Sequence, residues 1–543
     1  MAGVVQFAIC RLDSRVTDSL ASSTNDAWWS TAVGYEVYIR SFADGNGDGI
    51  GDLIGLTTKL DHLAWLGVDV LWITPFYRSP MADFGYDVAD YIDVDPMFGT
   101  LADFDALIAK AKRLEIKVVI DIVPNHSSAQ HAWFQQALAD PSGPYRDYYH
   151  FRDAPEDGSL PNNWVSYFGG PTWTLDEASG QYYLHMFLPE QPDLNWDNPA
   201  VHAEFETILR FWLDRGVDGF RIDVAQAMGK DQQLRSNPEL HPVDHSAFRW
   251  EQWDALEHRY DVLQPKTHDI FRSWKAITDE YSAVLIGETY VRDPDEFNAL
   301  VGSPSGLDIG FWFAPMHMAW SAEQVTEVLG ALGQQVSGKV GWVQASHDEH
   351  RPPTRFGGGD LGRRRSLSLA VLLLGMPGMP FLYQGEELGL EDGDVPPEAK
   401  MDPVGEDGDP TSGRDGCRTP IPWDDSEHRG FSSGEAAPWL PISHGVEDTV
   451  AYQRGRTDSW LAKYRQLLAT RRHLLTDRDD VVSEGARFVD LGADVVAVQR
   501  GPATFVVNFG DAAIDLGPGQ VLFRTEGAGN DPLGPDAGAI VVA

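Results

Sequence analysis

The sequence contains little cysteine and few basic residues. Cys10 and Cys417 are the only cysteines among 543 residues, and their separation offers neither a metal-binding spacing nor a disulfide framework. Isolated thiols suit a reducing compartment, so we expect a cytoplasmic protein. Lysine and arginine total 42 against 82 acidic residues, which gives a net charge of −40. Because nucleic acids and anionic membranes are bound through basic side chains, this balance argues against both as partners.

Long hydrophobic runs are also missing. The most apolar stretch, residues 367–383, is interrupted by Pro377 and Pro380, which favours a buried helix and a strand over a membrane span. Residues 1–28 carry Arg11 and Arg15 without a continuous apolar core behind them. We therefore expect a poorly ordered leader in this region and no signal peptide.

Short apolar runs typical of buried strands are present and alternate with helical patterns. The eight strand-like runs cover residues 35–42, 68–76, 117–123, 217–224, 283–288, 307–313, 341–346 and 379–383. The clearest helical patterns cover residues 53–66, 101–114, 202–215 and 322–332. Strands that alternate with helices form parallel βαβ units. Eight such units predict an α/β protein built on a closed (β/α)8 TIM barrel.

Two connections are too long for a plain barrel. Residues 127–196, rich in Trp, Tyr, Pro and Gly, predict an irregular subdomain over the barrel mouth, because long loops in compact folds are usually functional. The other long connection, rich in Gly, Asp and Pro, runs from Tyr383 to about residue 440, and a helix is expected at 459–475. Short alternating runs in residues 476–543 predict a C-terminal all-β domain, a β-sandwich. The barrel itself is assigned to residues 29–126 and 197–475.

Charged residues stand at the carboxyl ends of four predicted strands. The fourth run ends with Arg221 and Asp223, which point to the same face of the strand because they are two residues apart. The third run leads to His126, the fifth ends at Glu288, and the seventh leads to His347-Asp348. A single pair of this kind could be a structural ion pair, but four sets at matching strand ends indicate the catalytic face of a barrel.

Three carboxylates at one centre suit the hydrolysis of a glycosidic bond. Retaining glycosidases need an ionised carboxylate nucleophile and a protonated carboxylic acid. We expect Arg221 to lower the pKa of Asp223, which favours Asp223 as the nucleophile. Glu288 follows an apolar strand without an adjacent cation in the sequence and is therefore the candidate acid. Asp348, with His347, would hold sugar hydroxyls.

These motifs resemble the α-amylase superfamily of glycoside hydrolases, in particular its α-glucosidase and oligo-1,6-glucosidase branch. The resemblance covers residues 29–475. It is carried by Asp121-Ile-Val-Pro-Asn-His126, Gly219-Phe-Arg-Ile-Asp223, Ile286-Gly-Glu288, His347-Asp348 and Gln191-Pro-Asp-Leu-Asn-Trp196. It implies Asp223 as nucleophile, Glu288 as acid/base and Asp348 as transition-state stabiliser. It also implies that His126, Arg221 and His347 surround the reacting sugar.

Two positions depart from the usual pattern of the superfamily. Ser346 precedes His347 where many members have Asn, and Val224-Ala225-Gln226 follows the expected nucleophile. Val at that position resembles enzymes that accept α-1,6 linkages, whereas Ala or Thr resembles α-1,4-specific ones. The linkage therefore stays open at this point.

The segment from residue 44 to residue 52 alternates oxygen-bearing side chains with glycine. Hard cations prefer clustered oxygens, although a solvated turn rich in Asp and Asn explains the same pattern. Its twelfth position is Gly55, so a true EF-hand, which needs Glu there, is not expected. The resemblance implies one structural Ca²⁺ or Mg²⁺ held by Asp44, Asn46, Asp48, the Ile50 carbonyl and Asp52.

Further sugar contacts are implied by the resemblance. Asp83 and Tyr86 would bind the terminal glucose, and an arginine, Arg414 in preference to Arg418, would pair with Asp83. Phe187 and Gln191 would line the next sugar position. Tyr86 alone could equally be a core residue beside a turn. A pocket closed in this way predicts an exo-acting enzyme for short substrates.

The sequence therefore predicts a retaining exo-acting α-glucosidase for maltose-type or isomaltose-type oligosaccharides. A trehalose synthase or another glucosyl transferase or isomerase with the same site is the alternative. A catalytically inactive scaffold would be expected to have lost carboxylates and to carry a membrane anchor, whereas Asp223, Glu288 and Asp348 are all present. We expect a small oligosaccharide or disaccharide as the only ligand besides the cation, and a monomer or a homodimer.

Overall fold

The computed structural model describes residues 27–291, 293–302, 306–332, 338–403, 413–476 and 485–543. Cys10 lies outside these residues, and so does the predicted leader except for residues 27 and 28. Cys417 is a buried free thiol, as expected for an isolated cysteine. Across the described ranges, none of the helices combines the length and the apolar character that crossing a membrane would require.

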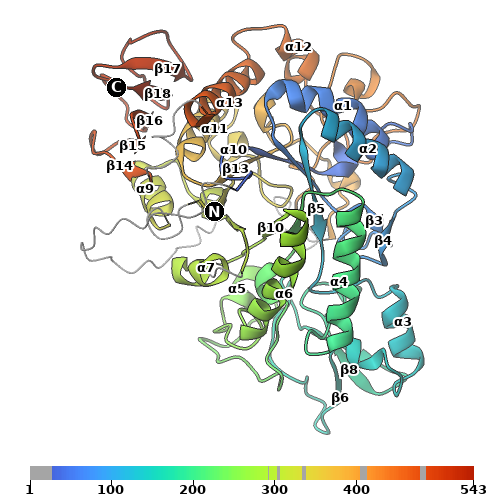
Figure 1. Cartoon of the computed structure of the whole chain (residues 1–543). Helices are drawn as coiled ribbons and strands as arrows, with labels where there is room; N and C mark the ends of the chain where they lie inside the picture. The colour runs from blue at the N-terminus through green and yellow to red at the C-terminus, as the bar shows by residue number, and fades with distance from the viewer. Residues whose placement is uncertain (1–26, 292, 303–305, 333–337, 404–412, 477–484) are drawn as a thin grey trace.

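Eight parallel strands close into a barrel in the order β1-β13-β12-β11-β10-β9-β5-β2 (Figure 1). They are β1 Gly34–Val37, β2 Val70–Ile73, β5 Lys117–Ile122, β9 Gly219–Ile222, β10 Val284–Gly287, β11 Ile309–Trp312, β12 Val340–Trp342 and β13 Met379–Tyr383. Each predicted run overlaps one of these strands, so the predicted TIM barrel is confirmed. The strands are buried along almost their whole length, which explains their continuous apolar runs.

Helices, several of which begin at a side chain that caps the helix, surround the barrel. They are α1 Leu53–Leu66, α2 Leu101–Arg113, α4 Pro199–Asp214, α6 Pro265–Tyr281, α7 Pro294–Val301, α8 Ala314–His317, α9 Ala322–Gly330, α10 Pro352–Arg355, α11 Gly359–Gly375, α12 Val450–Arg454 and α13 Trp460–Thr476. The Asp52 side chain caps the start of α1 and Gly67 ends it with φ 106°. Thr100 and Asp103 form a capping box on α2.

Most predicted strands run longer than the observed ones, although β13 has the predicted bounds. The first run was expected to reach Phe42, but β1 ends at Val37 and the chain then turns into the short 3₁₀ helix η1, Ile39–Ser41. Ile39 and Phe42 stay buried beneath the loops that follow the strands. Burial therefore extends beyond the sheet, and an apolar run alone does not show where the strand ends.

The insertion after β5 forms the expected subdomain. It contains α3 Ala132–Ala139, η2 Arg146–Tyr148 and a three-stranded sheet of β6 Phe151–Asp153, β7 Trp173–Asp176 and β8 Gln181–Leu184. A small hairpin, β3 Tyr77–Arg78 with β4 Asp90–Val94, follows β2. The expectation of only two long connections was wrong, because residues 223–264 form a third one between β9 and α6. It contains η3 Ala225–Ala227 and α5 Arg249–Trp253.

The C-terminal all-β domain is confirmed, with one sheet where a two-sheet sandwich was expected. Its strands, in sheet order, are β14 Arg487–Phe488, β15 Val495–Arg500, β16 Ala503–Asn508, β18 Gly538–Val542 and β17 Gln520–Arg524. One face packs on the apolar helix α11, where Ser368 donates a hydrogen bond to the Asp536 carbonyl. The barrel itself therefore covers the face that a second sheet would otherwise cover. In Figure 1 this domain and the β6–β8 subdomain lie at opposite corners of the molecule.

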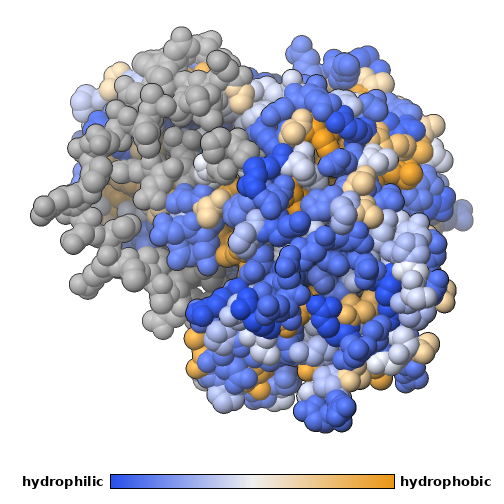
Figure 2. Space-filling view, turned by 60° about the horizontal axis from the view of Figure 1, so that its bottom comes forward, coloured by the Kyte–Doolittle hydropathy of each residue, from blue (hydrophilic) through white to orange (hydrophobic). Residues whose placement is uncertain are grey.

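The remaining short helices lie in loops, and the face drawn in Figure 2 is predominantly hydrophilic. The described 3₁₀ turns after β13 are η4 Glu386–Leu388, η5 Pro397–Ala399, η7 Glu427–Gly430 and η8 Val446–Asp448. On the face drawn in Figure 2, hydrophobic residues form small separate groups among hydrophilic ones. This agrees with the acidic composition of the chain.

Candidate active site

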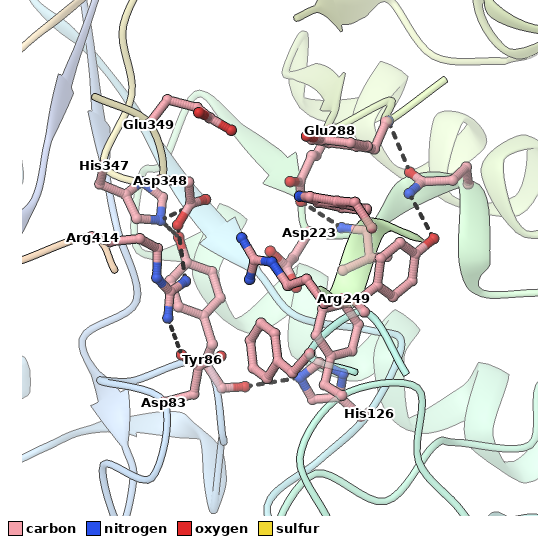
Figure 3. Close-up of a pocket in the computed structure, with 17 residues that line it drawn as sticks. Asp83, Tyr86, His126, Asp223, Arg249, Glu288, His347, Asp348, Glu349 and Arg414 are labelled. Atoms are coloured by element: carbon pink, nitrogen blue, oxygen red, sulfur yellow. Dashed lines mark hydrogen bonds and ion pairs between the residues drawn. The ribbon is translucent and has the colours of Figure 1, made fainter. Parts of the chain in front are cut away.

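A pocket of about 110 Å³ opens at the carboxyl end of the barrel strands. Figure 3 shows Asp223 and Glu288 on one side of it and Asp348, His347, Asp83 and Arg414 on the other. Its lining comprises Asp83, Tyr86, His126, Tyr167, Phe168, Phe187, Asp223, Val224, Gln226, Arg249, Trp250, Glu288, Tyr290, His347, Asp348, Glu349 and Arg414. The structure thus brings together residues from the ends of five barrel strands and from all three long connections.

Arg221 holds one side of the pocket from beneath. Its Nη1 atom donates to Asp121 Oδ1 at 2.7 Å and to Asp223 Oδ1 at 2.6 Å, while Nη2 lies 2.9 Å from Glu288 Oε2. The guanidinium carbon lies 5.0 Å from the ring centre of Trp72. Glu288 therefore does have a cationic neighbour, which its position in the sequence did not reveal. We refer to Arg221, Asp121, Asp223 and Glu288 as the Arg221 cluster.

The backbone at Val224, directly after Asp223, is strained, and in this conformation it forms a hydrogen bond to Glu288. Val224 has φ 45° and ψ 46°, the left-handed region that β-branched residues rarely occupy. In this conformation its backbone N–H donates to Glu288 Oε2 at 2.8 Å. A residue held in this region costs on the order of 1–3 kcal/mol and persists where the surroundings fix it. The turn thereby orients Glu288 with respect to Asp223.

The protonation of the Arg221 cluster differs from expectation. Burial and the charge of Glu288 raise the pKa of Asp223 well above its ordinary value, and Arg221 opposes this only in part. Burial likewise raises the pKa of Asp121 to about 6, with Arg221 again opposing. Arg221 does lower the pKa of Asp223, as predicted, but burial and the charge of Glu288 outweigh it, because one guanidinium is shared among three carboxylates.

The opposite side of the pocket holds two arginines. Arg414 Nη2 lies 3.1 Å from Asp83 Oδ1 and 2.8 Å from Asp402 Oδ1, and its Nη1 lies 3.0 Å from Asp348 Oδ1. Arg418 Nη2 donates to the same Asp348 oxygen at 2.8 Å. We refer to these five residues as the Arg414 cluster. Arg414 is thus the arginine that contacts Asp83, while Arg418 contacts Asp348.

In the Arg414 cluster the cations lower the pKa values of Asp348 and Asp402 more than burial raises them. Burial raises the pKa of Asp348, but His347, Arg414 and Arg418 together outweigh this and hold the pKa well below its usual range. Burial acts in the same direction on Asp402, and Arg414 and Arg418 again bring its pKa below the usual range. Asp348 and Asp402 are therefore ionised over the whole neutral and mildly acidic range.

Two histidines connect the walls of the pocket. His347 Nε2 lies 3.0 Å from the Tyr86 hydroxyl, and its Nδ1 lies 2.5 Å from Glu36 Oε1. The His347 ring stacks on Tyr86, with 5.5 Å between ring centres. His126 Nε2 lies 3.1 Å from the Tyr86 carbonyl oxygen, and burial lowers the pKa of His126. The Tyr86 side chain is thereby fixed between elements that are distant in the sequence.

Two of the predicted substrate contacts lie behind the lining. Gln191 is fully buried and its Nε2 donates to Asp83 Oδ2 at 3.2 Å. Arg221 is 3% exposed and contacts the carboxylates from below. Phe187, in contrast, does line the cavity and its ring centre lies 5.1 Å from that of His126. Gln191 and Arg221 therefore position residues that line the cavity.

Several lining residues were not predicted from the sequence. The third long connection supplies Arg249 and Trp250, whose ring stacks on Tyr290 with centres 5.6 Å apart. In Figure 3 the Arg249 side chain reaches into the space between the two clusters. Its Nε atom is buried and has no hydrogen-bond partner among the described residues. The other unpredicted lining residues are Tyr167, Phe168, Gln226, Tyr290 and Glu349. The Arg-Trp-Glu-Gln-Trp run at 249–253, in an otherwise long gap between predicted elements, was the available signal.

The predicted cation loop forms a compact turn ahead of α1. Asp44 accepts hydrogen bonds from the backbone of Asn46, Gly47 and Gly49, and Asp52 accepts from Gly45, Asn46 and Gly55. These bonds draw the oxygen-bearing side chains around one stretch of backbone, and the donor set consists of hard oxygens. Among the described residues, no three His, Cys, Asp or Glu side chains are grouped as metal ligands. A cation in this loop would therefore depend on Asn46 and on the Ile50 carbonyl as well as on the carboxylates.

Comparison with known sequences places this geometry in a family. The family model described as "Alpha amylase, catalytic domain" matches residues 36–478. The chain is 42% identical to the "Probable alpha-glucosidase" of Rhizobium meliloti (strain 1021), over 84% of this chain and 85% of that protein. It is 37% identical to the "Oligo-1,6-glucosidase" of Parageobacillus thermoglucosidasius, over 78% of this chain and 79% of that protein.

Solved structures give the same result. A crystal structure of an alpha-glucosyl transfer enzyme superposes with a TM-score of 0.86 at 38% identity, covering 95% of this chain and 99% of that one. A trehalulose synthase superposes with a TM-score of 0.83 at 32% identity, covering 95% and 100% of the two chains.

Proposed function

Because the chain belongs to the alpha-amylase family of glycoside hydrolases, we propose that it is a retaining α-glucosidase that releases glucose from the non-reducing end of short α-linked oligosaccharides. The observation that carries this proposal is the Arg221 cluster, in which one guanidinium contacts both Asp223 and Glu288. Retaining enzymes require two carboxyl groups about 5–5.5 Å apart, and a shared guanidinium between them favours such a short separation.

In the proposed reaction, Asp223 attacks the anomeric carbon while Glu288 gives its proton to the departing glycosidic oxygen. Water then hydrolyses the glucosyl-enzyme, with Glu288 accepting its proton as a general base. The charge of Glu288 raises the pKa of Asp223, so a proton placed on Glu288 removes that charge and favours the ionised form of Asp223. Asp348, ionised by its cations, would stabilise positive charge that develops on the sugar.

The Arg414 cluster supports exo-action. The ion pair between Asp83 and Arg414 lies at the closed end of a pocket of about 110 Å³, with Tyr86 and His347 beside it. A charge-assisted pair can hold neighbouring sugar hydroxyls in a fixed geometry. If this pair closes the pocket behind one glucose, as we propose, a sugar beyond the terminal glucose would clash with it.

The product pattern tests this proposal. Maltohexaose labelled at its reducing end is digested and sampled early, and we expect glucose and labelled maltopentaose as the first products. The released glucose should be the α-anomer when followed by NMR. Early maltose together with maltotriose, or release of the β-anomer, would contradict the proposal. The Asp223→Asn variant serves as the control for contaminating activity.

Transfer of the glucosyl group is a second candidate function. It is favoured by the similarity to a solved alpha-glucosyl transfer enzyme and to a trehalulose synthase. Both reactions share the glucosyl-enzyme and differ in whether water or a sugar hydroxyl accepts the glucose. Measuring free glucose beside disaccharide products from maltose, sucrose and trehalose separates the two. A predominance of new disaccharides at low substrate concentration would favour transfer.

The linkage preference rests on Val224 beside the nucleophile. The resemblance associates Val at this position with α-1,6 linkages, and the strained Val224 turn lies on the pocket wall next to Glu288. We therefore propose that isomaltose is a substrate in addition to maltose. Initial rates on maltose, isomaltose, sucrose, trehalose and soluble starch test this, and a rate on isomaltose no higher than that on starch would contradict it.

We also propose that Ca²⁺ or Mg²⁺ binds the loop formed by Asp44, Asn46, Asp48, Ile50 and Asp52. Its donor set of carboxylate, amide and carbonyl oxygens suits a hard cation. A cation that binds only the folded chain raises stability by mass action, so a chelator should lower the melting temperature and added Ca²⁺ or Mg²⁺ should restore it. An unchanged melting curve would contradict the proposal. The cytoplasmic location and the monomer or homodimer stay predictions.

A further inference from the structure

A second, larger cavity lies outside the barrel, between α1 and the helices α12 and α13. Its volume is about 850 Å³, and none of its lining residues belongs to the catalytic pocket. In Figure 1 the elements that bound it, α1, α12 and α13, lie along the upper edge of the molecule. We refer to it as the α1–α13 groove. It is bounded on the α1 side by Ala64–Gly67 and on the other side by residues 454–473.

The charge of the groove is opposite to that of the chain. Fifteen residues line it, and they include four arginines and one histidine but no aspartate or glutamate. At the average composition of this chain, fifteen residues would include about two acidic and about one basic residue. A chain with a net charge of −40 thus concentrates positive charge in a single depression. The basic lining residues are Arg454, Arg456, Arg465, Arg472 and His473.

Two of the arginines are drawn together by one tryptophan. The guanidinium carbon of Arg454 lies 4.3 Å from the ring centre of Trp65, and that of Arg465 lies 4.5 Å from it. The two guanidinium carbons are therefore at most about 9 Å apart, around the same ring. Like charges held this close repel each other unless a counter-charge lies between them.

A structural role accounts for only part of this cluster. Arg465 donates to the Trp65 carbonyl at 2.9 Å and Arg472 donates to the Gly67 carbonyl at 3.0 Å, so both stabilise the carboxyl end of α1. Arg472 also forms an ion pair with Asp69 at 2.5 Å. Arg454 and Arg456 cap nothing on α1, and among the described residues neither forms an ion pair with a carboxylate. Both are exposed.

We propose that the α1–α13 groove binds a small anion that carries a phosphate group. The planar guanidinium group matches phosphate oxygens in pairs, which makes clustered arginines a suitable phosphate site. Gln466 and Thr457 line the same groove and can hydrogen-bond hydroxyl groups of an attached sugar. A long polyanion is disfavoured, because beyond the groove it would meet the acidic surface of a chain with net charge −40. Inorganic phosphate and a sugar phosphate share the chemistry that this site recognises.

Calorimetric titration at low ionic strength tests the proposal. The probes are inorganic phosphate, glucose 6-phosphate and glucose, and the proteins are the wild type, R454Q/R456Q, and R210Q/R272Q as a control. Arg210 and Arg272 are exposed arginines on α4 and α6 that pair with Glu280 and Asp269, so the control removes the same charge elsewhere. Arg454 and Arg456 are exposed, so their replacement should leave the fold and the melting temperature unchanged.

We expect both phosphate compounds to bind the wild type and the control, and to bind R454Q/R456Q at least about tenfold more weakly. Tighter binding of glucose 6-phosphate than of phosphate would identify a sugar phosphate as the ligand, and equal binding would identify free phosphate. The proposal is overturned if neither compound binds or if both double variants lose affinity equally, whereas glucose, which the catalytic pocket would also bind, should bind the wild type and R454Q/R456Q alike. A change in oligomeric state without loss of phosphate binding would also overturn it and would assign the groove to self-association. Asp223→Asn, which alters only the catalytic pocket, should bind phosphate as the wild type does.

Discussion

The two sides of the active-site pocket are both built from arginines and carboxylates, but the pKa of Asp223 on one side is raised and that of Asp348 on the other is lowered. The Arg221 cluster sets one guanidinium against Asp121, Asp223 and Glu288. The Arg414 cluster sets two guanidiniums against Asp83, Asp348 and Asp402, with His347 beside them. Burial raises carboxyl pKa values on both sides, but only in the second cluster do the cations outweigh it.

This difference assigns different chemistry to each side. A raised pKa keeps a proton available among the carboxyl groups of the Arg221 cluster, as acid/base chemistry requires. A lowered pKa keeps Asp348 as a fixed negative charge that can hold hydroxyls and stabilise a cationic sugar. The Arg221 cluster, with one guanidinium group for three carboxylates, is therefore the side that exchanges protons. The Arg414 cluster, with two guanidinium groups for three carboxylates, is the side that binds the sugar.

The largest effect is expected from Asp223→Asn, which removes the nucleophile from the proton-exchanging side. The isosteric amide leaves Arg221 paired with Asp121 and Glu288, so the melting temperature should stay close to that of the wild type. Loss of covalent catalysis should lower kcat by at least about 10⁴-fold. A clean preparation that keeps more than about one percent of the rate would show that Asp223 is not the nucleophile.

A smaller loss is expected on the binding side. Asp83→Ala removes the carboxylate that pairs with Arg414 at the closed end of the pocket. An unpaired buried charge and lost hydroxyl contacts should lower kcat/KM for maltose by at least about a hundredfold. Its pH profile should keep the shape of the wild-type profile, because the Arg221 cluster is intact. The kcat/KM of Asp83→Asn, which retains hydrogen bonding, should lie between that of the wild type and that of Asp83→Ala. A loss of less than about tenfold would exclude a direct sugar contact.

The smallest effect is a shift of the acid limb of the pH profile in Glu288→Gln. An aryl α-glucoside with a good leaving group needs little protonation, so its kcat/KM reports attack by ionised Asp223. The charge of Glu288 raises the pKa of Asp223. The neutral Gln side chain removes that contribution, so the pKa falls and the acid limb should move to lower pH.

Arg418→Gln is the matched change on the other side of the pocket. It removes one cation from Asp348, whose pKa is still lowered by His347 and Arg414, so the rate should fall without movement of the acid limb. An acid limb that moves in Arg418→Gln and stays in place in Glu288→Gln would reverse the roles assigned to the two clusters.

Much of this architecture could be predicted from the sequence because it depends on local signals. Helix α1 has the predicted bounds, since Asp52 and Gly67 cap it on either side. The four charged strand ends were recognisable because parallel strands direct their carboxyl ends to one face. Arg249 and Asp402 were not recognised, because both come from long connections whose course depends on distant elements. The third connection was missed because residues 223–264 contain only two short helices among the described elements and little periodic pattern.

The sequence by itself determined the barrel, the three carboxylates at its mouth and the family to which the chain belongs. Only the tertiary structure decided how the charges are shared. Arg221 and Asp223 are neighbours in the sequence, which favoured a lowered pKa for Asp223, yet folding buries both and adds Asp121 and Glu288 to the same guanidinium. The arginine nearest to Asp348 in the sequence is Arg351, yet Asp348 forms its ion pairs with Arg414 and Arg418, which folding brings from more than 60 residues away. Electrostatic interactions act through space, and burial strengthens them, so protonation follows from tertiary contacts that no local pattern records.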